Sequence, residues 1–140
     1  MKYAVLFIAL LFAGCGESST IVDGYETFTI AGKRIQVAKE DFPEEMSWDD
    51  AMAACQNLGN GWRLPTKAEC EAIHNQLWKK GKVMFNKNGD DLQYWSSTEA
   101  GMRFGHDCAL THFFFDDAEG LSPESVKSLT LPARAVRTLP

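Results

Sequence analysis

The sequence predicts an α+β domain, in which two helices pack on a small, hairpin-rich antiparallel sheet with long loops between the elements. Strand-like segments come first in the 140-residue chain, two segments with helical periodicity follow, and further strand-like segments complete it. Because strands and helices do not alternate, the chain lacks the crossover units that build a parallel sheet. Glycine, asparagine, aspartate and proline separate the strand-like segments, as is typical of hairpins.

The N-terminus has the organisation of an export signal. Lys2 precedes about ten apolar residues, too few to span a bilayer, and the small residues Ala13 and Gly14 lead directly to Cys15. The pentapeptide that ends at Cys15 resembles the lipobox of bacterial lipoproteins, which implies acylation of this cysteine and cleavage before it. We therefore assign residues 1–14 to a lipoprotein signal peptide and expect a lipid-anchored protein of the bacterial cell envelope, at the outer membrane. An ordinary secretory signal is the alternative, and it also exports the chain.

The expected domain occupies residues 25–140 and begins with a hairpin. Residues 15–24 are mostly small and polar and lack an apolar period, so we expect the acylated cysteine to continue into a flexible tether. Alternating residues over 25–30, a turn at Gly32 and a second strand over 34–38 then predict the hairpin.

Capping residues and apolar spacing predict two helices. Ser47, with Asp50 three residues later, resembles a capping box, and Gly59 supplies the backbone conformation that ends the first helix. Thr66 and Glu69 form a second capping box. Each helix is expected to turn one apolar face towards the core. These faces consist of Trp48, Ala51, Cys55 and Leu58 in the first helix and of Cys70, Ile73, Leu77 and Trp78 in the second, which ends at Gly81.

Strand patterns return after the second helix. Alternation within the run Phe113, Phe114 and Phe115 must place at least one ring on the opposite face from its neighbours. The strands are expected over residues 83–85, 94–97, 103–115 and 133–137.

The charge balance argues against nucleic acid as a partner. The chain carries 14 Lys and Arg residues against 19 Asp and Glu residues, which gives a formal net charge of −5. A chain with this excess of acidic residues is not attracted to a polyphosphate backbone. We therefore expect contact with the membrane through the lipid on Cys15.

Three cysteines remain for the domain if Cys15 carries the lipid, so at most one internal disulfide can form. Cys55 and Cys70 lie on the apolar faces of the two predicted helices. They either pair with each other or pack as small hydrophobic residues, and the sequence leaves both alternatives open.

A histidine and cysteine pattern in the longest predicted strand offers atoms that suit zinc or an activated thiol. If residues 103–115 form one strand, His106, Cys108 and His112 share a face. Apolar residues share that face, so a buried surface with a core cysteine is the simpler interpretation. A thiol- or metal-dependent envelope enzyme that uses these three residues is the alternative.

Five short patterns occur in the order found in one protein family. They are Val37-Ala38 before Asp41-Phe42-Pro43, Trp48 with Ala51 and Cys55, Gly61-Trp62-Arg63-Leu64-Pro65-Thr66 with Glu69, Tyr94-Trp95-Ser96-Ser97-Thr98, and Arg134-Ala135-Val136-Arg137. Over nearly the whole chain after the tether, the sequence thereby resembles the family catalogued as domain of unknown function 1566. The resemblance implies a C-type-lectin-like fold, similar to the C-terminal domain of a bacterial collagen-like adhesin that binds host polysaccharide and distantly similar to formylglycine-generating sulfatase activators.

Several features of those relatives are missing from the sequence. It has neither the Glu-Pro-Asn or Gln-Pro-Asp loop nor the Trp-Asn-Asp strand with which lectins of this fold bind calcium and sugar. The last predicted strand lacks the cysteine that usually ties it to the first helix, and the paired catalytic cysteines of the activators have no recognisable counterpart. We therefore expect no enzymatic activity and no resident cofactor.

Two of the family patterns have structural interpretations. Trp62 is expected to fill the gap between the helices, while Pro65 sets the angle at which the chain enters the second helix. In the closing strand, Val136 is expected to point inward, and Arg134 and Arg137 to point outward or pair with acidic residues.

Trp95 and two acidic turns are the candidate ligand-binding residues. The ring of Trp95 either fills the core or stacks on a sugar. The pairs Asp90 with Asp91 and Asp116 with Asp117 carry oxygens of the kind that calcium binds, although solvated turns of this composition are common.

These observations predict a non-enzymatic binding or adhesion module whose partner is a glycan, a peptide or another envelope protein. A purely structural envelope lipoprotein, associated with itself or with the cell wall, is a further alternative.

Overall fold

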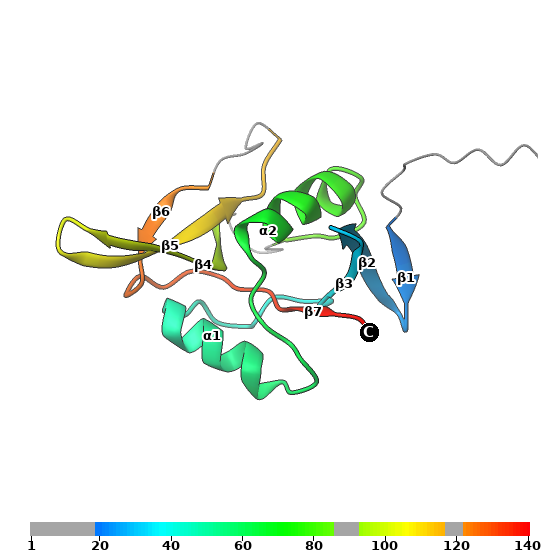
Figure 1. Cartoon of the computed structure of the whole chain (residues 1–140), viewed down its shortest axis with the longest axis horizontal. Helices are drawn as coiled ribbons and strands as arrows, with labels where there is room; N and C mark the ends of the chain where they lie inside the picture. The colour runs from blue at the N-terminus through cyan, green and yellow to red at the C-terminus, as the bar shows by residue number, and fades with distance from the viewer. Residues whose placement is uncertain (1–18, 86–92, 117–121) are drawn as a thin grey trace, which may run out of the picture.

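The computed structural model describes residues 19–85, 93–116 and 122–140 (Figure 1). These residues form two helices and two small antiparallel sheets, which confirms the predicted α+β class. The sequence predicted one sheet, whereas the strands divide into two. Several sequence-based assignments lie outside the described residues. They are the signal peptide over 1–14, the acylation site Cys15 and the candidate calcium ligands Asp90, Asp91 and Asp117.

The four-stranded sheet contains the predicted hairpin and lies at the right-hand end of Figure 1. Phe28 pairs with Ile35 across the hairpin, and both side chains are buried. The turn between them uses Ala31 and Gly32 at φ values of 48° and 75°. The strand order is β1-β2-β3-β7, with β1 at Thr20–Val22, β2 at Tyr25–Ile30, β3 at Lys33–Val37 and β7 at Val136–Thr138.

Strand β1 corrects the predicted tether over residues 15–24. Thr20 pairs with Thr27 of β2, and their hydroxyl groups hydrogen bond at 2.9 Å. The three residues of β1 are all β-branched, which favours the extended backbone. The folded part of the chain therefore begins several residues earlier than the sequence pattern indicated.

Both predicted helices form, and both begin at their predicted caps. Helix α1 covers Trp48–Asn57, and the hydroxyl of Ser47 accepts a hydrogen bond from the backbone N–H of Asp50. Helix α2 covers Lys67–Ile73 and has a complete capping box between Thr66 and Glu69. The sequence predicted one helix as far as Gly81, but the chain changes after α2 into a π-helix, η1, over His74–Trp78.

The second sheet consists of three strands in the order β4-β5-β6. Strands β4 and β5 form a long hairpin that extends to the left in Figure 1. Its turn consists of Phe104 and Gly105 at φ values of 50° and 81°, so the single strand predicted over 103–115 is wrong at its start. The turn was missed because its first position carries Phe104, where Asn, Asp or Gly is usual, and Gly105 alone is a weak signal. The bounds are Gln93–Arg103 for β4, His106–Phe113 for β5 and Glu124–Val126 for β6.

Two further strand assignments differ from the prediction. Residues 83–85 contain no strand, because Phe85 turns inward to join the core as part of an irregular segment. Strand β6 was not predicted, since three residues are too few to show alternation. The prediction for the triple phenylalanine is confirmed, because Phe114 is buried while Phe113 and Phe115 pack against each other with ring centroids 5.5 Å apart.

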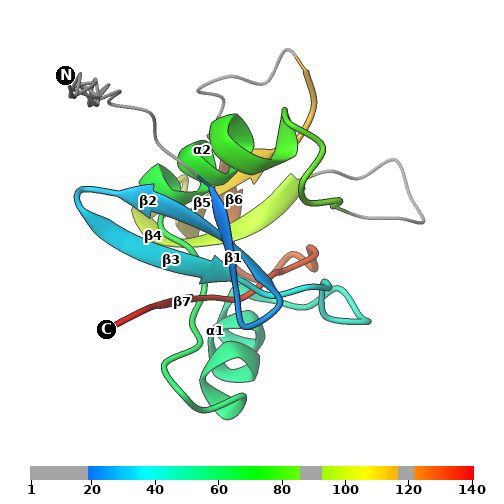
Figure 2. The same ribbon diagram turned by 90° about the vertical axis from the view of Figure 1, so that its right-hand side faces the viewer.

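Two apolar clusters lie on opposite sides of the chain that leads into β7, one under α2 and one against α1 (Figures 1 and 2). The segment over 131–136 is buried along its whole length. Within the described ranges, no helix is long and apolar enough to cross a membrane. The cluster under α2 contains Phe28, Ile35, Val37, Ile73, Leu77, Phe85, Tyr94, Phe114 and Val136, and the other contains Trp48, Ala51, Cys55, Leu64, Trp95, Ala109, Leu131, Ala133 and Ala135.

Candidate functional site

An open groove of about 520 Å³ lies where the four-stranded sheet meets the end of α1. Four segments supply most of its walls: the start of β2, residues 38–43, the C-terminal cap of α1 and the link to α2. The N–H of Ala38 donates to the carbonyl of Ala135, and that of Phe42 to the carbonyl of Ala133. These bonds fix residues 38–43 on the buried C-terminal segment, so the groove is built on the core.

One wall of the groove is a pair of aromatic rings. The centroids of Tyr25 and Trp62 lie 5.6 Å apart, with 53° between the ring planes. The guanidinium carbon of Arg137 lies 4.8 Å from the centroid of Trp62, and the Nζ atom of Lys39 lies 5.0 Å from that of Tyr25. Because Arg137 also donates from Nε to Oε1 of Gln36 at 2.7 Å, the cation on Trp62 is held in place.

A loop of left-handed residues brings Trp62 into this position. Gly59, Asn60 and Gly61 all have positive φ, between 52° and 79°, and the N–H of Trp62 donates to the carbonyl of Gly59. Glycine adopts this conformation at little cost, which explains its use on both sides of Asn60. The loop leaves Leu58 49% exposed on the rim of the groove. The predicted role of Trp62 is therefore met only in part, because its half-buried ring packs on the core and also faces the groove.

The link after Trp62 is fixed to α2 by a bidentate ion pair between Arg63 and Glu69. Arg63 donates to both carboxylate oxygens of Glu69, at 2.7 and 2.8 Å, and also to the hydroxyl of Thr138 in β7 at 3.0 Å. Hydrogen bonding to Glu69 raises the pKa of Arg63. Oε2 of the same carboxylate accepts the N–H of Thr66, so the helix cap and the link form one unit.

A buried polar cluster lies below the groove. Oδ1 of Asp41 accepts a hydrogen bond from Nε of Arg134, and Oδ2 accepts one from the hydroxyl of Tyr94, both at 2.6 Å. Arg134 is only 5% exposed, so the predicted pairing of this arginine with an acidic residue is confirmed in a buried setting. Asp41 lines the groove and at the same time compensates the buried charge.

Trp95 does not belong to this groove. Its side chain is fully buried, and its Nε1 donates to the carbonyl of Met46 at 2.8 Å. The sugar-stacking interpretation of Trp95 is therefore wrong, and the alternative that its ring fills the core is correct. Asp116 is exposed in a turn after β5.

The histidine and cysteine pattern of β5 does not come together as a site. His106 is exposed beside the hairpin turn, whereas Cys108 is buried near the start of the strand. His112 is buried and shares a 2.9 Å hydrogen bond with His74 of η1. Burial lowers the pKa of His112 to about 4, and the nearby His74 and Lys67 contribute to this shift. Within the ranges that the structure describes, no three His, Cys, Asp or Glu side chains are grouped to hold a metal ion.

The described cysteines are free and buried. Cys55 and Cys70 do not form a disulfide, so the alternative that they pack as small hydrophobic residues is the one observed. Burial raises the pKa of the Cys55 thiol to about 12 and raises that of Cys70 further. Thiols with such high pKa values are poor nucleophiles at neutral pH.

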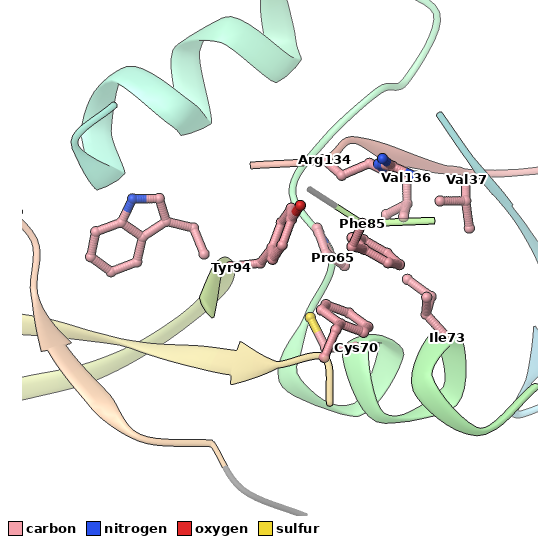
Figure 3. A pocket seen from close by; sticks show the side chains of 10 residues that line it. Val37, Pro65, Cys70, Ile73, Phe85, Tyr94, Arg134 and Val136 are labelled. Carbon is pink, nitrogen blue, oxygen red and sulfur yellow. The ribbon is translucent and has the colours of Figure 1, made fainter. Parts of the chain in front are cut away.

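A closed cavity of about 10 Å³ lies between the polar cluster and α2 (Figure 3). This is about the space of one water-sized probe, which is too small for a ligand. Apolar side chains such as Val37, Ile73 and Phe85 surround it, with Tyr94 and Arg134 at its edge. The open groove is therefore the candidate site.

The sequence pattern assigned Trp62 a structural role and Asp41-Phe42-Pro43 only a place among the family patterns, and it connected neither with Tyr25 or Leu58. Comparisons of the chain with protein-family models and with curated proteins find no match.

Proposed function

We propose that this chain is a non-enzymatic binding module of the bacterial cell envelope, held at the membrane by a lipid on Cys15, and that its ligand lies in the groove. The observation that carries the proposal is the groove itself, which combines an aromatic wall, an apolar rim and charged groups on a rigid base. The C-type-lectin-like fold implied by the family resemblance is part of the proposal, and the pairing of two helices with two small antiparallel sheets supports it.

The position of β1 limits how far the domain can lie from a lipid on Cys15. Only residues 16–19 separate Cys15 from the first strand. Four residues span at most about 14 Å when fully extended. A lipid on Cys15 therefore keeps the domain within about this distance of the membrane surface, where envelope glycans, peptides and proteins are the available ligands.

The test uses the full chain in mild detergent against arrayed envelope glycans, peptides and proteins. Leu58→Glu places a charge on the rim of the groove at a side chain that is 49% exposed, so ligand capture is expected to fall about tenfold or more. Leu129→Glu is the matched control, because Leu129 is 52% exposed and lies outside the groove. Equal capture by the two variants would refute the groove as the binding site.

Two measurements test the remaining parts of the proposal. Wild-type chain is expected to incorporate labelled palmitate and to fractionate with membranes, whereas Cys15→Ser does neither. A wild-type chain without label would exclude the anchor. The thiols of Cys55 and Cys70 are expected to remain unmodified at neutral pH until the protein unfolds, and rapid labelling in the folded state would favour a thiol enzyme instead.

A further inference from the structure

A second hollow, of about 230 Å³, lies beside the groove and has a different character. Ala38 and Lys39 line both spaces, so the two are neighbours on one surface. The hollow is lined by three cationic side chains, Lys39, Lys82 and Arg134, and by one acidic side chain, Glu26. This excess of positive charge contrasts with the net charge of −5 of the whole chain.

Arg134 is the unusual member of this group, because an almost fully buried guanidinium retains unused donors. Nε donates to Asp41, and the planar group lies 4.4 Å from the ring centroid of Phe85. Its two terminal amino groups, Nη1 and Nη2, donate no hydrogen bond to any described residue. Neither amino group is among the described polar atoms that are fully buried without a partner, so both are open to solvent and can donate to an acceptor in the hollow.

The two lysines also lack acidic partners. Lys82 donates to the hydroxyl of Ser19, and Lys39 lies on the ring of Tyr25, but neither forms an ion pair with another described residue. A Cβ atom on Gly24 would lie 3.3 Å from Nζ of Lys39, so glycine at this position leaves room for the ammonium group. Asp41 balances the charge of Arg134, so the two lysines, opposed by Glu26, supply the unpaired positive charge of the hollow, and Arg134 supplies the unused donors.

We propose that this hollow binds the C-terminal carboxylate of a peptide whose last side chains lie in the groove. A planar carboxylate matches the paired terminal donors of an arginine. The two lysine ammonium groups add positive charge on flexible side chains, so they need no fixed orientation of the carboxylate. The binding of a ligand in the groove is taken from the proposed function, and the hollow specifies which end of the ligand is recognised.

The groove favours a peptide over a sugar as the remainder of the ligand. Cations already lie on ring faces of Tyr25 and Trp62, where a sugar would stack. The lining of the groove also includes Phe42, Pro43 and Leu58, which suit apolar side chains.

The probes are the tripeptide N-acetyl-Ala-Phe-Leu with a free C-terminus and the same peptide as its C-terminal amide, titrated calorimetrically into the full chain in mild detergent. The free acid is expected to bind about tenfold more tightly than the amide. Its advantage is expected to shrink as the ionic strength rises, while the affinity of the amide stays constant.

Three single variants separate recognition of the carboxylate from general loss of structure. Lys39→Gln and Lys82→Gln are each expected to reduce the preference for the acid about threefold, because each removes one exposed charge. Glu26→Gln removes the only acidic side chain among the described residues that line the hollow, so it is expected to raise the affinity for the acid about threefold. A gain in affinity cannot arise from unfolding. Lys33→Gln, an exposed lysine outside both spaces, is the matched control and is expected to change nothing.

Equal binding of acid and amide to the wild-type chain would refute the carboxylate site while leaving a ligand in the groove intact. Binding of neither peptide would refute the assignment of a peptide ligand. The peptide ligand would also be refuted if glucuronate bound while the peptides did not, and if Lys39→Gln weakened and Glu26→Gln strengthened the binding of glucuronate. Leu58→Glu, in contrast, tests the groove and is expected to weaken acid and amide alike.

Discussion

Two buried polar clusters contact the same pair of stacked phenylalanine rings, and they differ in how their polar groups are compensated. Arg134 lies on Phe85, His74 stacks near Phe114, and the two phenylalanine rings are 3.8 Å apart. The first cluster keeps full charges and joins arginine, aspartate and tyrosine. The second consists of two histidines that share a single hydrogen bond.

The difference between the clusters follows their distance from the surface of the groove. Asp41 lines the groove and Arg134 lines the hollow, so the charged cluster borders both spaces where a ligand is proposed to bind. His74 and His112 are each 1% exposed and line neither space. Charge is retained where it can meet a ligand, whereas the closed surroundings of His112 lower its pKa and so favour its neutral form.

The largest expected effect comes from removing one partner of the charged cluster. Asp41→Ala leaves the guanidinium of Arg134 buried without its carboxylate, which is expected to lower the free energy of unfolding by about 3–5 kcal/mol. Urea denaturation followed by tryptophan fluorescence measures this loss. Glu45→Ala removes an exposed carboxylate and is expected to cost less than about 0.5 kcal/mol. The double variant Asp41→Ala with Arg134→Met is expected to recover part of the loss. A loss below about 1 kcal/mol in Asp41→Ala alone would contradict the claim that Asp41 compensates a buried charge on Arg134.

Acid is expected to act on His112 in the second cluster. The pKa of His112 falls from 6.5 to about 4 on folding, so between these values the unfolded chain binds a proton that the folded chain does not. Stability from this source is complete above pH 6.5 and declines as the pH falls towards 4, by about 3 kcal/mol in total. Urea denaturation across this range, in the wild type and in His112→Gln, isolates the contribution.

His106→Gln is the matched control for the acid effect, since His106 is exposed in the same strand. Its stability is expected to depend on pH as that of the wild type does, whereas His112→Gln loses the part of the dependence between pH 6.5 and 4. Identical pH dependence in His112→Gln and the wild type would mean that folding does not lower the pKa of His112.

The two clusters also show where the sequence was informative. The helix caps at Ser47 and Thr66 were predicted, because capping depends on residues three apart. For Arg134 the sequence left two alternatives open, an outward side chain or a pair with an acidic residue, and the structure shows the pair. The partnership of His74 with His112 was not predicted, since 38 residues separate them and only the packing of η1 on β5 brings them together.

The groove was missed for the same physical reason. Its aromatic wall joins residue 25 to residue 62, and its rim adds the cap of α1, so no local window contains the pattern. Trp95 was offered as a ligand-binding residue because a strand pattern does not reveal which face of a sheet is covered. The glycines that flank Asn60 were the local sequence signal near the groove, and Gly59 was used only to end the first helix. In the structure both Gly59 and Gly61 have positive φ.

The smallest of the three effects concerns the hydrogen bond that joins the charged cluster to the core. Tyr94→Phe removes the hydroxyl that donates to Oδ2 of Asp41 at 2.6 Å and leaves the ring packing unchanged. A hydrogen bond to a charged acceptor contributes about 2 kcal/mol, so a loss of this size is expected in urea denaturation. Tyr25→Phe is the matched control, because the Tyr25 hydroxyl makes no hydrogen bond to a described residue, and it is expected to cost less than about 0.5 kcal/mol. If the two variants lose the same stability, the Tyr94 hydroxyl does not contribute to holding the carboxylate of Asp41, and the cluster depends on the ion pair with Arg134 instead.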